Sequence, residues 1–170
     1  MSVLTGLGRL HDFVTRMGAI AAALCLGAIG LLYFSEVLSR YFLHAPTSWT
    51  AAVSIYLMLV VTMLMLPFLT MKNDHVTVSM NEYLPGPVAR GLTVAAIAAA
   101  TIVCLVSTYI TYEEMARAFL RGTRTTDTLF IPKWWLMAFI VYGLASTTIH
   151  FARQFWTSIA TRPAEEAARA

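Results

Sequence analysis

Residues 49–71 read WTAAVSIYLMLVVTMLMLPFLTM and contain no Asp, Glu, Lys or Arg. With a rise of about 1.5 Å per residue, one helix of this length crosses the roughly 30 Å hydrocarbon core of a membrane. Residues 17–35, 91–112 and 134–152 are equally free of charge. The sequence predicts an all-α integral membrane protein with one four-span domain over residues 1–170. Its spans are expected at about residues 17–38, 49–71, 91–112 and 132–152, with short interfacial helices between them.

Composition favours a membrane protein over a soluble one. The chain has 170 residues, of which 58% are hydrophobic and 12% charged, and its mean hydropathy is +0.68. Soluble domains carry about 25% charged residues. The net charge of +3 is small and its cations are scattered, which argues against a nucleic-acid-binding protein. We expect the first span to be retained, because the apolar core of a cleaved signal peptide has only about 7 to 15 residues.

Turn and helix-end signals divide the chain between the spans. Residues 85–87, Pro-Gly-Pro, force a turn, and Gly122 is a natural stop for the third helix. Pro132 suits the first turn of the fourth helix, whereas Thr47 and Ser48 offer the second helix a hydroxyl cap. Two short stretches are predicted to be interfacial from their apolar spacing, the second more weakly: Val76, Met80, Tyr83 and Leu84, then Leu4, Leu7, Leu10 and Val14.

The positive-inside rule gives an orientation. Four spans place both termini and the connection between the second and third spans on one side of the membrane. That side holds seven of the 12 Lys and Arg residues: Arg9, Arg16, Lys72, Arg90, Arg153, Arg162 and Arg169. The other five are Arg40, Arg117, Arg121, Arg124 and Lys133. The narrow excess predicts cytoplasmic N- and C-termini.

The spans lack the groups with which a secondary transporter moves a solute by itself. Such proteins place ionisable residues or broken helices near the bilayer midplane. Here no carboxylate or lysine lies at the centre of a span, and Pro67 is near the end of the second span. No polar stripe is predicted to line a span as a pore would require. We therefore expect the chain to act beside another protein.

Small residues at four-residue spacing mark faces on which membrane helices approach closely. One stripe contains Ala19, Ala23 and Gly27, and another contains Gly91, Ala95 and Ala99. Both stripes fit packing inside the four-helix unit, and both fit docking to a second membrane subunit.

Eight positions are candidates for partner contacts or structural roles: Glu36, Arg40, Trp49, His75, Arg117, Arg121, Arg124 and Trp134. Glu36 and Arg40 have the spacing of a helical ion pair. The two tryptophans suit the headgroup region, and His75 suits a helix cap. The three later arginines, with Lys133, form a basic outer surface that fits an acidic partner or lipid phosphates. No catalytic or metal site is predicted, because no nucleophile–base pair or metal-ligand spacing is present.

Together these stretches resemble the small membrane subunit, of DctQ type, of tripartite ATP-independent periplasmic (TRAP) transporters. The matching segments are Glu36 with Arg40-Tyr41-Phe42, Ser48-Trp49-Thr50, His75-Val76, Leu84-Pro85 with Arg90, and Ile131-Pro132-Lys133-Trp134-Trp135. They follow one another over almost the whole chain. Ala51, Ala52 and Ser79 stand where family members often carry acidic residues, so no role is transferred to these positions.

The resemblance implies a partner rather than a chemistry. Subunits of this kind pair in the bacterial inner membrane with a large subunit that holds the substrate and sodium sites. A soluble periplasmic binding protein delivers the substrate. The chain itself would be no enzyme and would bind no cofactor, and it would support sodium-coupled uptake of organic acids. The basic outer surface then becomes a candidate docking surface for the binding protein.

Two other classes remain open from the sequence. The histidines His11, His44, His75 and His150 suggest a haem-binding or structural anchor subunit of a redox complex, although only His150 lies inside a predicted span. A self-contained structural or channel-forming four-span protein is the other class. A Soret absorbance band would identify the first, and the mass with and without a co-expressed neighbour would identify the second.

Overall fold

The computed structural model describes residues 2–44, 49–72, 86–125 and 130–160. These residues form four helices: α1 (Ser2–Phe42), α2 (Thr50–Met71), α3 (Gly86–Leu120) and α4 (Lys133–Ala160). Each helix contains a segment long and apolar enough to cross a membrane: Gly8–Phe42, Thr50–Met71, Gly91–Leu120 and Lys133–Ser158. The prediction of an all-α protein with four spans is confirmed.

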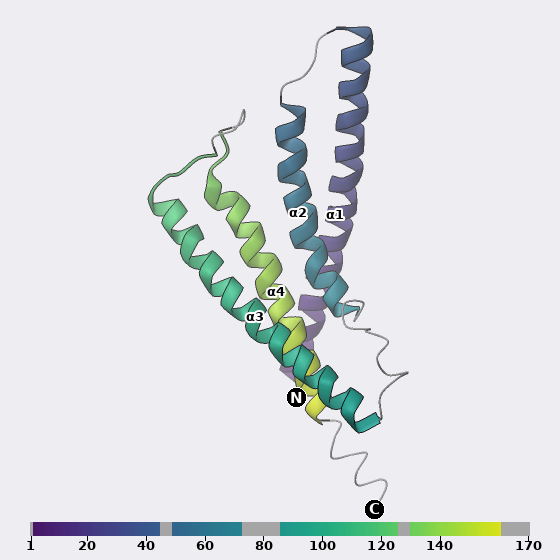
Figure 1. Ribbon diagram of the computed structural model, residues 1–170, viewed down its shortest axis with the longest axis vertical. Helices are drawn as coiled ribbons and strands as arrows, with labels where there is room; N and C mark the ends of the chain where they lie inside the picture. Colours follow the sequence, from purple (N-terminus) through teal and green to yellow (C-terminus); the bar gives the residue numbers. More distant parts are fainter. Residues whose placement is uncertain (1, 45–48, 73–85, 126–129, 161–170) are drawn as a thin grey trace, which may run out of the picture.

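The helices form an open row rather than a closed bundle. α1 packs on α2, α2 on α4, and α4 on α3. The two pairs lie close together at the end where α1 begins and α4 ends, and they separate toward the other end (Figure 1). We call these the terminal end and the distal end. Most large apolar side chains of α1 and α3 are exposed, as expected for helices that face lipid or a partner.

α1 is a single helix of 41 residues, about 60 Å long at the standard rise per residue. The prediction of a separate interfacial segment around Leu10 and Val14 is therefore wrong. The polar residues of this segment have partners within the protein. Thr15, for example, is buried and hydrogen-bonded to His150 of α4. The other predicted interfacial segment, residues 76–84, lies outside the described residues.

The end of α3 follows the sequence signal. Gly122 has a φ of 60°, a left-handed conformation that glycine adopts without steric penalty. Its amide donates to the Phe119 carbonyl at 3.2 Å, and the Thr123 amide donates to the Ala118 carbonyl at 3.2 Å. This pair of bonds satisfies the last carbonyls of the helix and confirms Gly122 as its stop.

The start of α4 differs from the prediction, whereas the cap predicted for α2 stays a prediction. The residue that precedes α2 is Trp49, which makes no side-chain cap hydrogen bond, and Thr47 and Ser48 lie outside the described residues. α4 begins at Lys133, and Pro132 is paired with Arg124 in an isolated antiparallel bridge. This pairing holds the proline just before the helix instead of in its first turn.

α2 and α4 approach each other at backbone distance. Pro67, inside α2, has no N–H to donate to the Met63 carbonyl one turn earlier. Gly143 of α4 lies against this carbonyl, because a Cβ atom added to it would lie 2.5 Å from the Met63 oxygen. A glycine in one span thus meets a carbonyl freed by a proline in the next.

The small-residue stripes have different outcomes. On α1 the buried positions are Thr15, Ala19 and Ala22, whereas Ala23 is exposed and a Cβ at Gly27 would meet open space. The packed face of α1 is therefore rotated from the predicted stripe. The α3 stripe of Gly91, Ala95 and Ala99 is exposed throughout, so it does not serve packing among the described helices.

Candidate functional site

A polar cluster joins α1 to α4 at the terminal end. Its members are His11, Asp12 and Thr15 of α1 with Ser146, His150 and Arg153 of α4. Thr15, Ser146 and His150 expose 3% or less of their surface. The three α4 residues recur at spacings of four and three, which places them on one face of the helix. Such a face in an apolar helix needs polar partners, and α1 supplies them.

The two histidine rings of this cluster are in contact. Their centroids are 4.5 Å apart and their planes are inclined by 36°. His11 Nε2 lies 2.9 Å from Ser146 Oγ, and Thr15 Oγ1 lies 3.1 Å from His150 Nε2. Each imidazole is therefore held by a hydroxyl of the opposite helix.

An ion pair lies at the edge of the cluster. Arg153 Nη1 donates to Asp12 Oδ1 at 2.6 Å, and Nη2 lies 3.4 Å from Oδ2. The two side chains expose 47% and 30% of their surface, so water or headgroups screen the pair. Ion pairs this exposed contribute about 1 kcal/mol or less to stability. The main effect of this pair is to orient the Asp12 carboxylate.

The same part of α4 also holds the end of α2. Gln154 Nε2 donates to the carbonyl of Thr70 at 2.6 Å. Thr70 lies in the last turn of α2, where carbonyls have no partner within the helix. The cluster and the neighbouring Gln154 thus tie three helices together where the two pairs converge.

Three groups in the cluster are potential metal ligands. His11, Asp12 and His150 each offer one ligand atom, and these atoms lie within 4.8 Å of one another. Haem fits this arrangement poorly, because a macrocycle held between two imidazoles would separate rings that here touch. The haem alternative suggested by the histidine count thus finds no support in their geometry.

Sequence reasoning missed this cluster for a specific reason. It placed His11 before the first span, apart from His150, and it looked for a polar stripe only as the lining of a pore. In the structure His11 lies in the continuous helix α1, and the polar residues of α4 face α1 instead of a pore. The signal that was available is the four-residue spacing of Ser146, His150 and Gln154.

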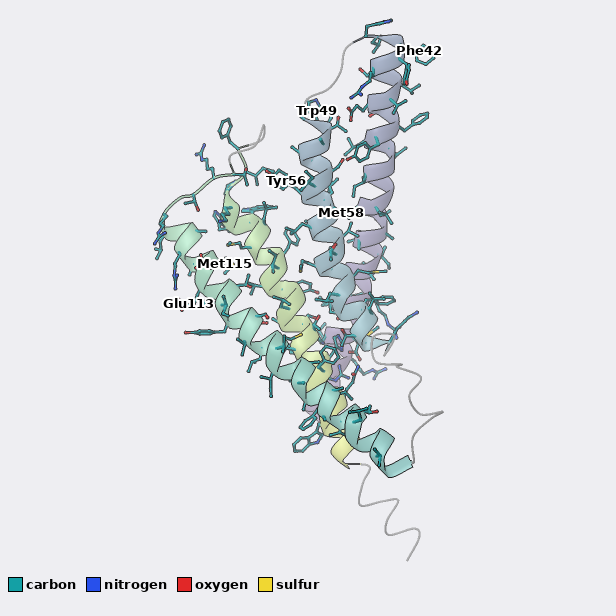
Figure 2. The ribbon with its side chains drawn as sticks, in the orientation of Figure 1. Phe42, Trp49, Tyr56, Met58, Glu113 and Met115 are labelled. Carbon is teal, nitrogen blue, oxygen red and sulfur yellow. The ribbon has the colours of Figure 1, made fainter. Side chains whose placement is uncertain are left out.

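At the distal end, Glu36 and Arg40 form the predicted ion pair at 2.9 Å. Glu36 is the more buried partner, with 15% of its side chain exposed against 62% for Arg40. Trp49 is exposed at the start of α2, near the end of the molecule where Phe42 closes α1 (Figure 2). His75 lies outside the described residues, so its predicted role stays a prediction.

The basic outer surface is smaller than the sequence suggests. Arg117 binds Glu114 at 3.0 Å and Glu113 at 3.3 Å, so local carboxylates neutralise it. Glu113 lies near the distal end of α3 (Figure 2). Arg121 and Arg124 are exposed, and neither has an ion pair with another described residue.

Backbone pairing gathers the remaining cations of the α3–α4 connection. The Lys133 amide donates to the Thr123 carbonyl at 3.1 Å, next to the bridge between Arg124 and Pro132. These backbone contacts hold the exposed Lys133 close to Arg124. We call the three exposed cations of the α3–α4 connection that pair with no described carboxylate the distal cations: Arg121, Arg124 and Lys133.

Trp134 and Trp135 have different surroundings. Trp134 is half-buried and meets the Phe119 ring of α3 edge to face, with centroids 5.6 Å apart. Trp135 is exposed and suits a headgroup position. The first tryptophan therefore packs α4 against α3, and the headgroup position expected for Trp134 stays a prediction.

The sequence of this chain matches a known protein family. The family of tripartite ATP-independent periplasmic transporters, DctQ component, matches residues 29–161. The chain belongs to the DctQ family. It is therefore a membrane component of a TRAP transporter and a transport subunit rather than an enzyme. No curated protein matches the chain.

The DctQ match covers about the last third of α1 and the whole of α2 and α3, and it includes His150 and Arg153 of α4. The α1 half of the polar cluster, His11, Asp12 and Thr15, precedes the matched residues. The distal cations and the Glu36–Arg40 pair lie within them. The two ends of this DctQ component thus differ in how far the family accounts for them.

Proposed function

We propose that this DctQ component braces the large membrane subunit of its transporter and helps the periplasmic substrate-binding protein to dock. The observation that carries the proposal is the exposed small-residue stripe of α3, Gly91, Ala95 and Ala99. Small residues let two membrane helices approach closely, and no described helix of this chain uses these ones. A helix of the large subunit is the partner that this face fits.

The distal cations support the second half of the proposal. With cytoplasmic termini, they face the periplasm, where a soluble binding protein arrives. Exposed cations that pair with no carboxylate among the described residues attract an acidic surface and speed its encounter. In this proposal the large subunit binds the organic acid and sodium, and this chain supplies contact surface only.

Bulky substitutions in the stripe test the bracing role. We expect Ala95→Leu with Ala99→Leu to reduce the co-purified large subunit several-fold, because leucines force the two helices apart. The measurement is the ratio of the two subunits after affinity purification from membranes. Ala96→Leu is the matched control, because Ala96 is also exposed on α3 but lies outside the stripe. An unchanged ratio in the double variant would contradict the bracing role.

Charge reversal tests the docking role. We expect Arg121→Glu with Arg124→Glu to weaken the apparent affinity for the binding protein about fivefold or more, since reversed charges repel an acidic surface. The measurement is uptake by proteoliposomes at limiting binding-protein concentration. Arg121→Lys with Arg124→Lys retains the charge and should retain the affinity. Raised salt should shrink the difference, and equal uptake by both variants at low salt would overturn the docking role.

A further inference from the structure

We propose that His11, Asp12 and His150 form a zinc-binding site that links α1 to α4 at the terminal end. Each residue offers one ligand atom, and the three atoms lie within 4.8 Å of one another. In a tetrahedral zinc site with Zn–N distances near 2.1 Å, ligand atoms are about 3.4 Å apart. Side-chain adjustments on the order of an ångström therefore convert the observed cluster into a coordinating one.

His11 already has the hydrogen-bonding pattern of a metal ligand. Its Nε2 lies 2.9 Å from Ser146 Oγ, whereas its Nδ1 is buried and has no hydrogen-bond partner among the described residues. Leaving a buried polar atom unpaired costs about 1–3 kcal/mol. Histidines that bind metals use one ring nitrogen for the ion and the other for an outer hydrogen bond, so a metal at Nδ1 removes this penalty.

The neighbour of His150 favours one tautomer. The Thr15 hydroxyl has a single hydrogen, and the His11 carbonyl at 3.0 Å accepts it. With this bond made, the hydroxyl offers His150 Nε2, 3.1 Å away, a lone pair, which favours the tautomer with the hydrogen on Nε2. His150 Nδ1 then carries the free lone pair. Both imidazoles thus present Nδ1 and hold Nε2 against a hydroxyl.

Asp12 supplies the third ligand. Arg153 holds Oδ1 firmly at 2.6 Å and Oδ2 only loosely at 3.4 Å, which leaves Oδ2 for the ion. A hydrogen-bonded carboxylate is the usual arrangement beside a metal. The guanidinium also cancels the carboxylate charge, so we expect a dissociation constant on the order of micromolar rather than nanomolar.

The donor set favours zinc over magnesium and calcium. Two imidazoles and one carboxylate suit zinc, whereas magnesium and calcium prefer sites made of oxygen atoms. A hollow of about 250 Å³ beside the cluster gives an entry route and space for a water as fourth ligand. Asp12, His150 and Arg153 are among the residues that line it.

A zinc ion here would add a direct link between two helices that are not among the extensively packed pairs. It would stabilise the folded chain, because the unfolded chain does not hold the three ligands together. This role is independent of the bracing and docking roles proposed above, and it concerns the α1 residues that the DctQ family match does not include.

Zinc binding by the full chain tests the site directly. The chain is purified in detergent with a tag that contains no histidine and titrated with zinc sulfate at equilibrium, with free zinc raised well above the expected micromolar dissociation constant. We expect one zinc ion per chain, the visible absorption of tetrahedral cobalt after Co²⁺ substitution, and a higher thermal midpoint with zinc. His11→Asn and Asp12→Asn should each weaken zinc binding about tenfold or more.

His44→Asn is the matched control, because His44 is exposed at the distal end and already has a φ of 52°. It should bind zinc like the parent chain. If His11→Asn fails to fold, Asp12→Asn still decides, since its amide oxygen can keep the Arg153 hydrogen bond. Less than stoichiometric zinc in the parent chain, or equal binding by the parent and Asp12→Asn, would overturn the proposal.

Discussion

A single missing methyl group at Gly143 sets how closely α4 approaches α2. The neighbouring Met63 carbonyl lacks a helical donor because Pro67 cannot supply one. Such a carbonyl still needs weak partners, and a glycine backbone offers Cα–H groups that a larger residue would shield. Next to it, Thr147 directs its hydroxyl to the Gly143 carbonyl at 2.7 Å, so the polar atoms of this crossing stay within the helices.

Gly143→Ala is therefore expected to destabilise the chain. The added Cβ would lie 2.5 Å from the Met63 oxygen and 3.1 Å from its Cβ, so the two backbones must separate. Overpacking of this kind lowers the free energy of unfolding by about 1–3 kcal/mol. The measurement is the thermal unfolding midpoint in detergent.

Gly30→Ala provides the opposite control. A Cβ at position 30 of α1 would meet nothing within 4 Å. Alanine favours a helix over glycine by about 0.8–1 kcal/mol, so this variant should be slightly more stable than the parent chain. Equal midpoints for Gly143→Ala and the parent chain would show that α2 and α4 are not held at this distance.

At the scale of the helices, the sequence was sufficient to predict that four helices form and that each can span a membrane. Long uncharged runs have only one way to satisfy their backbone groups in lipid, so four spans followed directly. The stop at Gly122 was equally local, because a left-handed residue after a helix needs glycine. The Glu36–Arg40 pair, set by spacing within one helix, was also correct.

The orientation of each helix was less predictable, because it depends on residues far apart in the chain. Thr15 of α1 finds its partner 135 residues later, at His150. The buried face of α1 therefore follows Thr15, Ala19 and Ala22 rather than the predicted stripe. The ion pairs of Arg117 with Glu113 and Glu114 are local by contrast, and their spacing of four and three residues predicts them from the sequence.

At the scale of the whole molecule, the two ends have opposite character. The terminal end is closed by hydrogen bonds between α1, α2 and α4. The distal end is where the helix pairs separate and the distal cations are exposed (Figure 1). A periplasmic protein can dock on the distal cations only if the distal end faces the periplasm. The count of basic residues favours this orientation narrowly.

Site-specific labelling tests this orientation. Cys25 and Cys104, both free, are replaced by alanine, and Gly6→Cys or Thr123→Cys is then introduced. Both positions are exposed, and neither change alters the charge that sets topology. We expect an impermeant maleimide to label position 123 in intact spheroplasts and position 6 only after lysis, with the cysteine-free chain as control. The reverse pattern would place the distal cations in the cytoplasm and remove the docking role, while the bracing and zinc proposals would stand on their own measurements.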